Sequence, residues 1–210
     1  MKNLILPHLR PALTLLAVFS LLTGLAYPAA VTGLCQALFP AQANGSLVME
    51  NGIAVGSALI GQPFASPGSF WGRPSATAPG PDNAMASSGS NLGPSNPALY
   101  AAVAERAARL RAADPGNAAP VPAELVEASA SGLDPHLSPA AVMYQVPRVA
   151  RARGITPERV RELVRAGIEP RQFGILGEPR VNVLLLNMAL DRLAGGPPRP
   201  APAPLAQPGQ

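Results

Sequence analysis

The chain of 210 residues has room for one ordinary domain and a short appendage, and it carries a net charge of +4 with only 13% charged residues. Proline (26) and glycine (20) are frequent, but their combined share stays just below the range that indicates a wholly disordered chain. Lys2 is the only lysine, which excludes a nucleotide-binding P-loop, whose lysine follows its glycines, and the phosphorylation motif of a P-type ATPase, which also contains a lysine.

The N-terminal segment predicts a single transmembrane helix over residues 11–35. About 20 apolar residues, at 1.5 Å each, are enough to cross a hydrocarbon core of about 30 Å. Basic residues occur in residues 1–10, and no further charge follows until Glu50, so the N-terminus is expected in the cytoplasm and the remainder outside. A cleaved signal peptide is the alternative, with "GLA" at Gly24–Ala26 as the stretch before the cut. The only cysteine, Cys35, excludes an internal disulfide.

Residues 42–194 predict a mixed α/β soluble domain on the extracytoplasmic side, with a β-hairpin, several short helices and long loops rich in glycine, proline and serine. The dipeptide Asn51-Gly52 predicts the hairpin, because both of its turn positions require a positive φ. The proline-rich tail, residues 195–210, is expected to be disordered.

The longest predicted loop covers residues 65–97. A loop of this length is uncommon in a compact domain unless it forms a binding surface or wraps a partner. Phe70 and Trp71 are the residues expected to anchor it.

Three helices are predicted to start with a capping residue followed by proline, at Asn96-Pro97, Ser138-Pro139 and Thr156-Pro157. Pro147 is expected to divide the second of these into two short helices, because proline removes a helical hydrogen bond. A last helix is expected within residues 177–196. Its predicted apolar face consists of Val181, Leu184, Leu185 and Met188.

A polar stretch between two predicted helices, residues 127–145, raises the question of catalysis. Asp134 and His136 are too few for a metal site, since the soluble part has no other histidine and no cysteine. A hydrolase triad of Ser131, His136 and Asp134 is disfavoured, because residues so close in sequence rarely face one another and no G-x-S-x-G motif is present. A turn capped by Asp134 is the favoured interpretation.

Arginines recur along residues 148–165, but glutamates alternate with them. This pattern is typical of a solvated helix face with ion pairs one turn apart, and it argues against nucleic acid as a partner. The stretches "SNLGPSNPA" and "SGLDPHLSPA" also share the pattern S-x-L-x-P before a capped helix. The two helix starts either pair in space or share only their turn chemistry.

Six motifs occur in order along the chain: "GSALIGQPF", "FWGRPSA", "SGSNLGPSNPAL", "SASGLDPHLSPAA", "YQVPRVARARG" and "GEPRVNVLLLNMALD". Together they closely resemble the C-subunit family of the Kdp potassium-transporting ATPase, over nearly the whole chain except the proline-rich tail. The resemblance implies one helix in the bacterial inner membrane and a soluble domain. It also implies three partners: a channel-like potassium-binding subunit, a P-type ATPase subunit and a small single-span subunit. K⁺ is then the transported ion and is not bound by this non-catalytic chain.

The resemblance further implies a catalytic chaperone that raises the ATP affinity of the pump subunit. ATP is the only cofactor implied, either on this chain or through the pump subunit. The residues that would bind the nucleotide are Ser129, Ser131, Gly132 and Gln145.

The predicted topology disagrees with this role, because it places the same loop outside the membrane, where ATP is scarce. We therefore expect the loops at Ser90–Asn96 and Ser131–Ser138 to be rigid turns that dock on the potassium-binding subunit. The alternative function is a membrane-anchored extracytoplasmic enzyme or solute-binding domain. The predicted interface residues are Arg73, Ser90, Asn91, Ser95, Asn96, Asp134 and His136.

Overall fold

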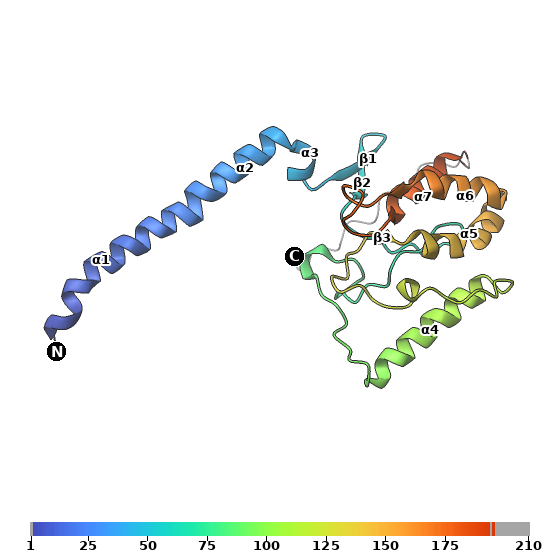
Figure 1. The fold of residues 1–210 in the computed structure, drawn as a ribbon, viewed down its shortest axis with the longest axis horizontal. Coiled ribbons are helices and arrows are strands. Elements are labelled where there is room, and N and C mark those ends of the chain that lie inside the picture. Colours follow the sequence, from blue (N-terminus) through green and yellow to red (C-terminus); the bar gives the residue numbers. More distant parts are fainter. Residues whose placement is uncertain (1, 194, 196–210) are drawn as a thin grey trace, which may run out of the picture. The chain divides into compact units, whose positions relative to one another are not determined.

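The computed structural model describes residues 2–193 and 195, and the chain divides into two units, Met1–Ser46 and Leu47–Gln210. Figure 1 shows the first unit as a helix that runs nearly its whole length and the second as a mixture of helices, short strands and long loops. The predicted fold class, an apolar N-terminal helix followed by a mixed α/β domain, is confirmed. The predicted tail at 195–210 lies, apart from Gly195, outside the described residues.

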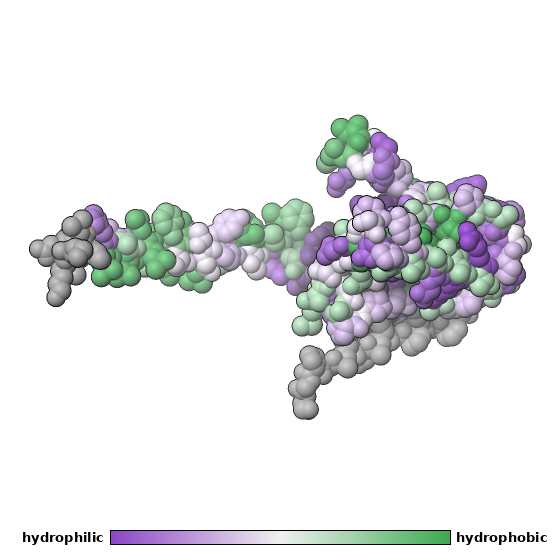
Figure 2. All heavy atoms as spheres, turned by 90° about the horizontal axis from the view of Figure 1, so that it is seen from below, coloured by the Kyte–Doolittle hydropathy of each residue, from purple (hydrophilic) through white to green (hydrophobic). Residues whose placement is uncertain are grey.

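The N-terminal helix consists of α1 (Lys2–Leu21), a π-helical turn (Leu22–Ala26) and α2 (Tyr27–Leu38), followed by the short α3 (Pro40–Ala43). A window long and apolar enough to cross a membrane covers Pro7–Leu38, and hydrophobic side chains line this helix in Figure 2.

The π-turn has a cause in the sequence. Pro28 has no N–H and its ring crowds the carbonyl one turn earlier, so the helix widens just before it. Tyr27 accordingly donates its backbone N–H to the carbonyl of Leu22, five residues back.

The predicted hairpin is confirmed as β1 (Leu47–Glu50) and β2 (Ile53–Ser57), which pair antiparallel. Asn51 (φ 51°) and Gly52 (φ 80°) form its turn with the expected positive φ values. A bulge between Val48 and Met49 shifts the register of the two strands.

The core of the second unit lies between three helices and a small sheet. The helices are α5 (Pro139–Arg153), α6 (Pro157–Ala166) and α7 (Val183–Leu193). The antiparallel sheet has β5 (Arg180–Asn182) at its centre, between β3 (His136–Leu137) and β4 (Ile168–Glu169). Valines dominate the fully buried side chains, among them Val142, Val146, Val149, Val160, Val164 and Val181.

The remaining elements precede this core in the sequence. Helix α4 (Pro97–Ala113) is followed by a 3₁₀ turn at Ala123–Leu125, and a second 3₁₀ turn lies at Ala84–Ala86. The predicted long loop is present, and its Phe70 is fully buried in the core. The expectation that aromatic residues anchor this loop is confirmed.

Three local predictions are wrong. Helix α5 continues through Pro147, because the side chains on either side of it, Val146 and Arg148, are buried in the core and hold the helix together. The last helix starts only at Val183, since Val181 belongs to strand β5. Thr156 precedes α6 but its side chain makes no capping hydrogen bond.

Candidate functional site

Two buried side-chain amides hold the long loop on the core. Gln145 on α5 accepts the N–H of Trp71 at 2.8 Å and donates to its carbonyl at 3.0 Å. Asn187 on α7 makes the same pair of hydrogen bonds with Phe70: its side-chain amide accepts the Phe70 N–H at 2.8 Å and donates to the Phe70 carbonyl at 2.9 Å. Buried backbone groups must find partners, and here the amides supply them where no strand does. The loop is thereby fixed at two consecutive residues.

Arg148 on α5 contacts the same loop and the Gln145 side chain. Its guanidinium donates to the carbonyl of Ser69 at 3.0 Å and to Oε1 of Gln145 at 2.7 Å, and it lies 4.2 Å from the centre of the Trp71 ring. Desolvation by burial lowers the pKa of Arg148 to about 10, so it remains charged at neutral pH. The prediction that the arginines of residues 148–165 form a solvated face is therefore wrong for Arg148, which is 3% exposed.

The prediction for this arginine-rich segment holds better on α6. There Arg161 pairs with Glu158 at 2.8 Å on an exposed face. The pair is three residues apart rather than four, which is an equivalent spacing on a helix.

The segment Ser129–Gly132 is a tight turn packed on the long loop. Oγ of the buried Ser129 accepts the N–H of Gly132 at 2.8 Å, and Oγ of Ser131 accepts the N–H of Leu133 at 3.1 Å. Gly132 has a φ of 68°, and a Cβ there would lie 2.6 Å from the carbonyl oxygen of Ser88. The turn thus requires a glycine both for its backbone angle and for the space.

The structure places the four residues of the implied nucleotide site in two environments. Ser129, Ser131 and Gly132 share the turn, and their two hydroxyls accept the backbone N–H groups of Gly132 and Leu133. Gln145 is 1% exposed, and its amide is occupied by Trp71 and Arg148. The nucleotide site stays a prediction. In this conformation the side chain of Gln145 holds the long loop through its hydrogen bonds to Trp71.

Arg73, Asp134 and His136 lie together at the next turn. Nη1 of Arg73 donates to Oδ2 of Asp134 at 2.9 Å, while Oδ1 of Asp134 accepts the N–H of His136 at 3.0 Å. Burial, the largest single influence, raises the pKa of Asp134, but the hydrogen bonds from His136 and Arg73 and the charge of Arg73 together outweigh it and lower the pKa to about 2. The interpretation of Asp134 as a capped turn is confirmed by its bond to His136.

The other predicted interface residues lie on the loop that leads into α4. Ser90, Asn91 and Ser95 are exposed, and Asn96 caps α4 by accepting the N–H of Ala98 at 2.9 Å. In the part of the chain that the structure describes, no hydrogen bond or ion pair joins these four to the other three. The predicted interface residues therefore form two groups.

The loops that carry these two groups do touch one another upstream. Oγ of Ser87 donates to the carbonyl of Ser131 at 3.0 Å, and a Cβ on Gly89 would lie 2.9 Å from the carbonyl oxygen of Ala130. These contacts lie before the first S-x-L-x-P stretch, so pairing of the two helix starts stays a prediction.

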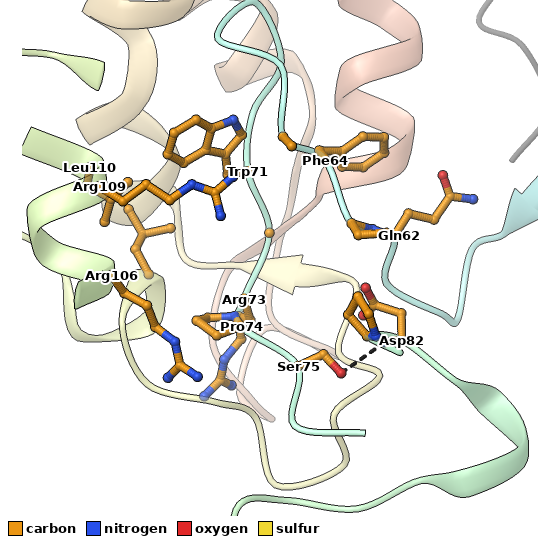
Figure 3. A pocket seen from close by; sticks show the side chains of 15 residues that line it. Gln62, Phe64, Trp71, Arg73, Pro74, Ser75, Asp82, Arg106, Arg109 and Leu110 are labelled. Carbon is orange, nitrogen blue, oxygen red and sulfur yellow. Dashed lines mark hydrogen bonds between the residues drawn. The ribbon is translucent and has the colours of Figure 1, made fainter. Parts of the chain in front are cut away.

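A cavity of about 250 Å³ opens between the long loop and α4. Arg106 and Arg109 reach it from α4, while Trp71, Arg73 and Asp82 reach it from the long loop, as Figure 3 shows. Desolvation by burial raises the pKa of Asp82 to about 6. Sequence reasoning missed this site, because α4 carries no motif and its arginines resemble ordinary surface residues.

The described residues contain no group of three or more His, Cys, Asp or Glu side chains that could hold a metal ion. In the suggested triad, His136 Nδ1 lies 3.7 Å from Asp134 Oδ1, but Ser131 Oγ is engaged with Leu133 and lies near Ser129 Oγ. The geometry thus offers turns, a fixed loop and a cationic cavity rather than a hydrolytic centre.

Comparison with known proteins gives a consistent result. The profile of the family described as "K+-transporting ATPase, c chain" matches residues 9–192. A relative from Polaromonas naphthalenivorans is 64% identical over 193 residues, which cover 92% of this chain and 96% of the relative. Relatives from Variovorax paradoxus and Methylococcus capsulatus are 65% and 62% identical over 186 residues, covering 89% of this chain and 96% and 98% of their own. All three are named potassium-transporting ATPase KdpC subunit.

Proposed function

The chain belongs to the KdpC family, the c chain of K⁺-transporting ATPases, and from this premise we propose that it stabilises a potassium-import pump from the extracytoplasmic side of the membrane. As a member of this family it is an accessory subunit of such a pump and associates with the membrane. One observation carries the proposal: the family match runs through residues 9–192 and so includes both the apolar helix and the soluble unit. Hydrolysis of ATP then belongs to another subunit, in line with the lack of a P-loop lysine here.

The proposed topology is a single pass through the bacterial inner membrane. Lys2 and Arg10 lie at the N-terminal end of the apolar helix, and the next charged residue is Glu50. Cytoplasmic flanks carry an excess of lysine and arginine, which supports a cytoplasmic N-terminus and a soluble unit outside.

The proposed contact with the potassium-binding subunit uses the two groups of interface residues. The turn at Asp134 is held by Arg73 and by its own bond to His136, so it needs little ordering when a partner arrives. Preorganised surfaces lose less conformational entropy on binding, and this favours a rigid turn as a docking element. The P-type ATPase subunit and the small single-span subunit complete the proposed assembly.

A group of exposed apolar side chains also supports the proposal that the chain works within a complex. Phe173, Ile175 and Leu176 are 87%, 75% and 54% exposed, within one short turn that Gln172 and Leu176 close by pairing. Exposed apolar side chains grouped in this way are typical of protein contact surfaces.

The finer role, raising the ATP affinity of the pump subunit, is the second proposal. It is supported by the family resemblance alone, and direct contact between the nucleotide and the turn at Ser129–Gly132 would require that turn to face the cytoplasm. A periplasmic soluble unit would confine any effect on ATP affinity to an indirect one through the pump subunit.

Co-purification tests the main proposal. The tagged chain should bring a P-type ATPase subunit with it from membranes, whereas a free enzyme or solute-binding protein would come alone. The double substitution Asp134→Ala with His136→Ala should weaken assembly but leave ATP turnover per assembled complex near normal. The exposed pair Glu158→Ala with Arg161→Ala is the control and should assemble normally. Normal assembly of the Asp134 and His136 variant with abolished turnover would contradict the proposal.

A further inference from the structure

The cavity beside α4 has more positive charge than its own carboxylates neutralise. Arg106 donates a hydrogen bond from Nη1 to the carbonyl of Val126 at 2.8 Å, and the guanidinium of Arg109 stacks 4.6 Å from the centre of the Trp71 ring. Among the described residues, neither guanidinium has a carboxylate within ion-pair distance. A concave surface with an excess of one sign of charge, here three arginines against Asp82, concentrates ligands of the other sign.

Arg73 adds a third guanidinium to the same cavity. One of its amino groups pairs with Asp134, but its Nε is buried and has no partner among the described residues. Nε itself is out of reach of a ligand in this conformation, but the Arg73 side chain is 27% exposed overall, so its charge can still attract an anion to the cavity.

Apolar side chains form part of the remaining wall, beside the polar Gln62, Ser75 and Asp82. Trp71, Phe64, Leu110 and Leu125 line the space between the arginines and the loop. Figure 3 shows the two α4 arginines on one side of the cavity and Asp82 on the other. A volume of about 250 Å³ lies just below the usual range for drug-sized ligands, which suits a smaller molecule.

We propose that this cavity binds a small organic carboxylate, with its oxyanion on Arg73, Arg106 and Arg109 and a flat apolar body against Phe64, Leu110 and Leu125. Guanidinium groups bind carboxylates through paired N–H donors, and this chemistry matches the cationic side of the cavity. The aromatic and leucine side chains bury the body of the ligand. The proposal concerns the soluble unit itself and does not depend on the pump function.

The same carboxylate chemistry has two sources, a free small molecule or an acidic side chain of a neighbouring subunit. Benzoate serves as the probe for both, because it joins one carboxylate to a flat apolar ring. If a neighbouring subunit fills the cavity, benzoate will bind the isolated chain but not the assembled complex. If the natural ligand is free, benzoate will bind both.

The chain contains a single tryptophan, and it lies in this cavity, so its fluorescence reports binding without a label. The full chain in detergent is titrated with benzoate at constant ionic strength, with excitation at the red edge of tryptophan absorption. A saturable change in Trp71 fluorescence is expected for benzoate, and none for the neutral benzamide. The same response to both compounds would overturn the proposal, as would the lack of a saturable response to benzoate.

Variants of α4 and of a remote helix complete the test. Arg109→Gln and Arg106→Gln should each raise the dissociation constant for benzoate roughly tenfold or more, as expected for loss of a charge-assisted hydrogen bond. Arg159→Gln is the matched control, because Arg159 is exposed on α6 and does not line the cavity. Equal affinity in wild type and both α4 variants would show that benzoate binds elsewhere and would refute the site.

Discussion

The side-chain amide of Gln145 forms two hydrogen bonds with the main chain of Trp71, in the way that one strand pairs with the next. The two residues are 74 positions apart, and Gln145 is 1% exposed. This contact fixes the loop that carries Trp71 and Arg73, and therefore positions both the Arg73–Asp134 pair and one wall of the cavity.

Replacement of this amide should destabilise the soluble unit. Gln145→Met keeps a similar volume but leaves both backbone groups of Trp71 and one donor of Arg148 without a partner. We expect a loss of about 2–4 kcal/mol in the free energy of unfolding. Thermal unfolding of the full chain in detergent, followed by tryptophan fluorescence, measures it. The exposed Gln172→Met should stay within about 0.5 kcal/mol of wild type, and equal losses in the two variants would refute the role of Gln145.

Two glycines with similar backbone angles should respond differently to alanine. Gly132 has φ +68° and would place a Cβ 2.6 Å from both Ser88 O and Thr77 Cγ2, whereas Gly154 has φ +65° with nothing within 4 Å. Gly154→Ala should cost about 1 kcal/mol for the left-handed conformation alone. Gly132→Ala should cost about 3 kcal/mol or more, because a clash adds to it. Unfolding temperatures of the two variants compare these costs, and equal shifts would mean that the turn at Ser129–Gly132 is not packed as described.

The raised pKa of Asp82 predicts that the folded chain loses stability as the pH rises. Its folded-state pKa of about 6 lies above the ordinary value of 3.8, so the folded chain binds this proton more tightly than the unfolded chain. The resulting stabilisation is complete below pH 3.8 and disappears as the pH rises through 6.

Asp82→Asn should remove that dependence. Asparagine tolerates the left-handed φ of 56° at this position, so the substitution adds little strain. At neutral to mildly alkaline pH the variant should be more stable than wild type by on the order of 1 kcal/mol, since water screens part of the burial cost. The free energies of unfolding of the variant and the wild type should become similar as the pH is lowered to about 3.8, where the carboxyl group of Asp82 is protonated in the folded chain. A wild type that is equally or more stable at mildly alkaline pH would contradict this prediction.

The lowered pKa of Asp134 predicts that the folded chain loses stability as the pH falls into the acid range. Its pKa is lowered from 3.8 to about 2, so its stabilising contribution is present above pH 3.8 and is lost as the pH falls through 2. Asp134→Asn should therefore reduce stability by about 1–2 kcal/mol at neutral pH, because the ion pair with Arg73 is partly exposed. Unfolding curves at a series of pH values should converge for wild type and variant in that acid range. A constant difference down to the acid limit would assign the effect to packing instead.

Local signals in the sequence were sufficient for several elements. Asn51-Gly52 predicted the hairpin, and Asn96 and Ser138 predicted two capped helix starts, because these features depend on neighbouring residues alone. The resemblance to the KdpC family predicted the fold class over nearly the whole chain.

Features set by distant contacts were not predictable in this way. Helix α5 continues through Pro147 because its neighbours Val146 and Arg148 are buried in the core. Strand β5 has three residues, which are too few to show an alternating strand pattern in the sequence. Arg148 looked like a surface residue, since its partners Ser69 and Trp71 are far from it in sequence. The cavity beside α4 could not be foreseen for the same reason, because it forms only where the long loop crosses that helix.

The side of the membrane on which the soluble unit stands is the central claim, and C-terminal reporter fusions to the full chain test it most directly. Alkaline phosphatase folds into an active enzyme outside the cytoplasm, whereas a standard fluorescent protein matures only inside it. We predict an active phosphatase fusion and a dark fluorescent-protein fusion in cells that assemble the pump. An inactive phosphatase with a bright fluorescent protein would contradict the extracytoplasmic role and would favour a nucleotide role for the Ser129–Gly132 turn.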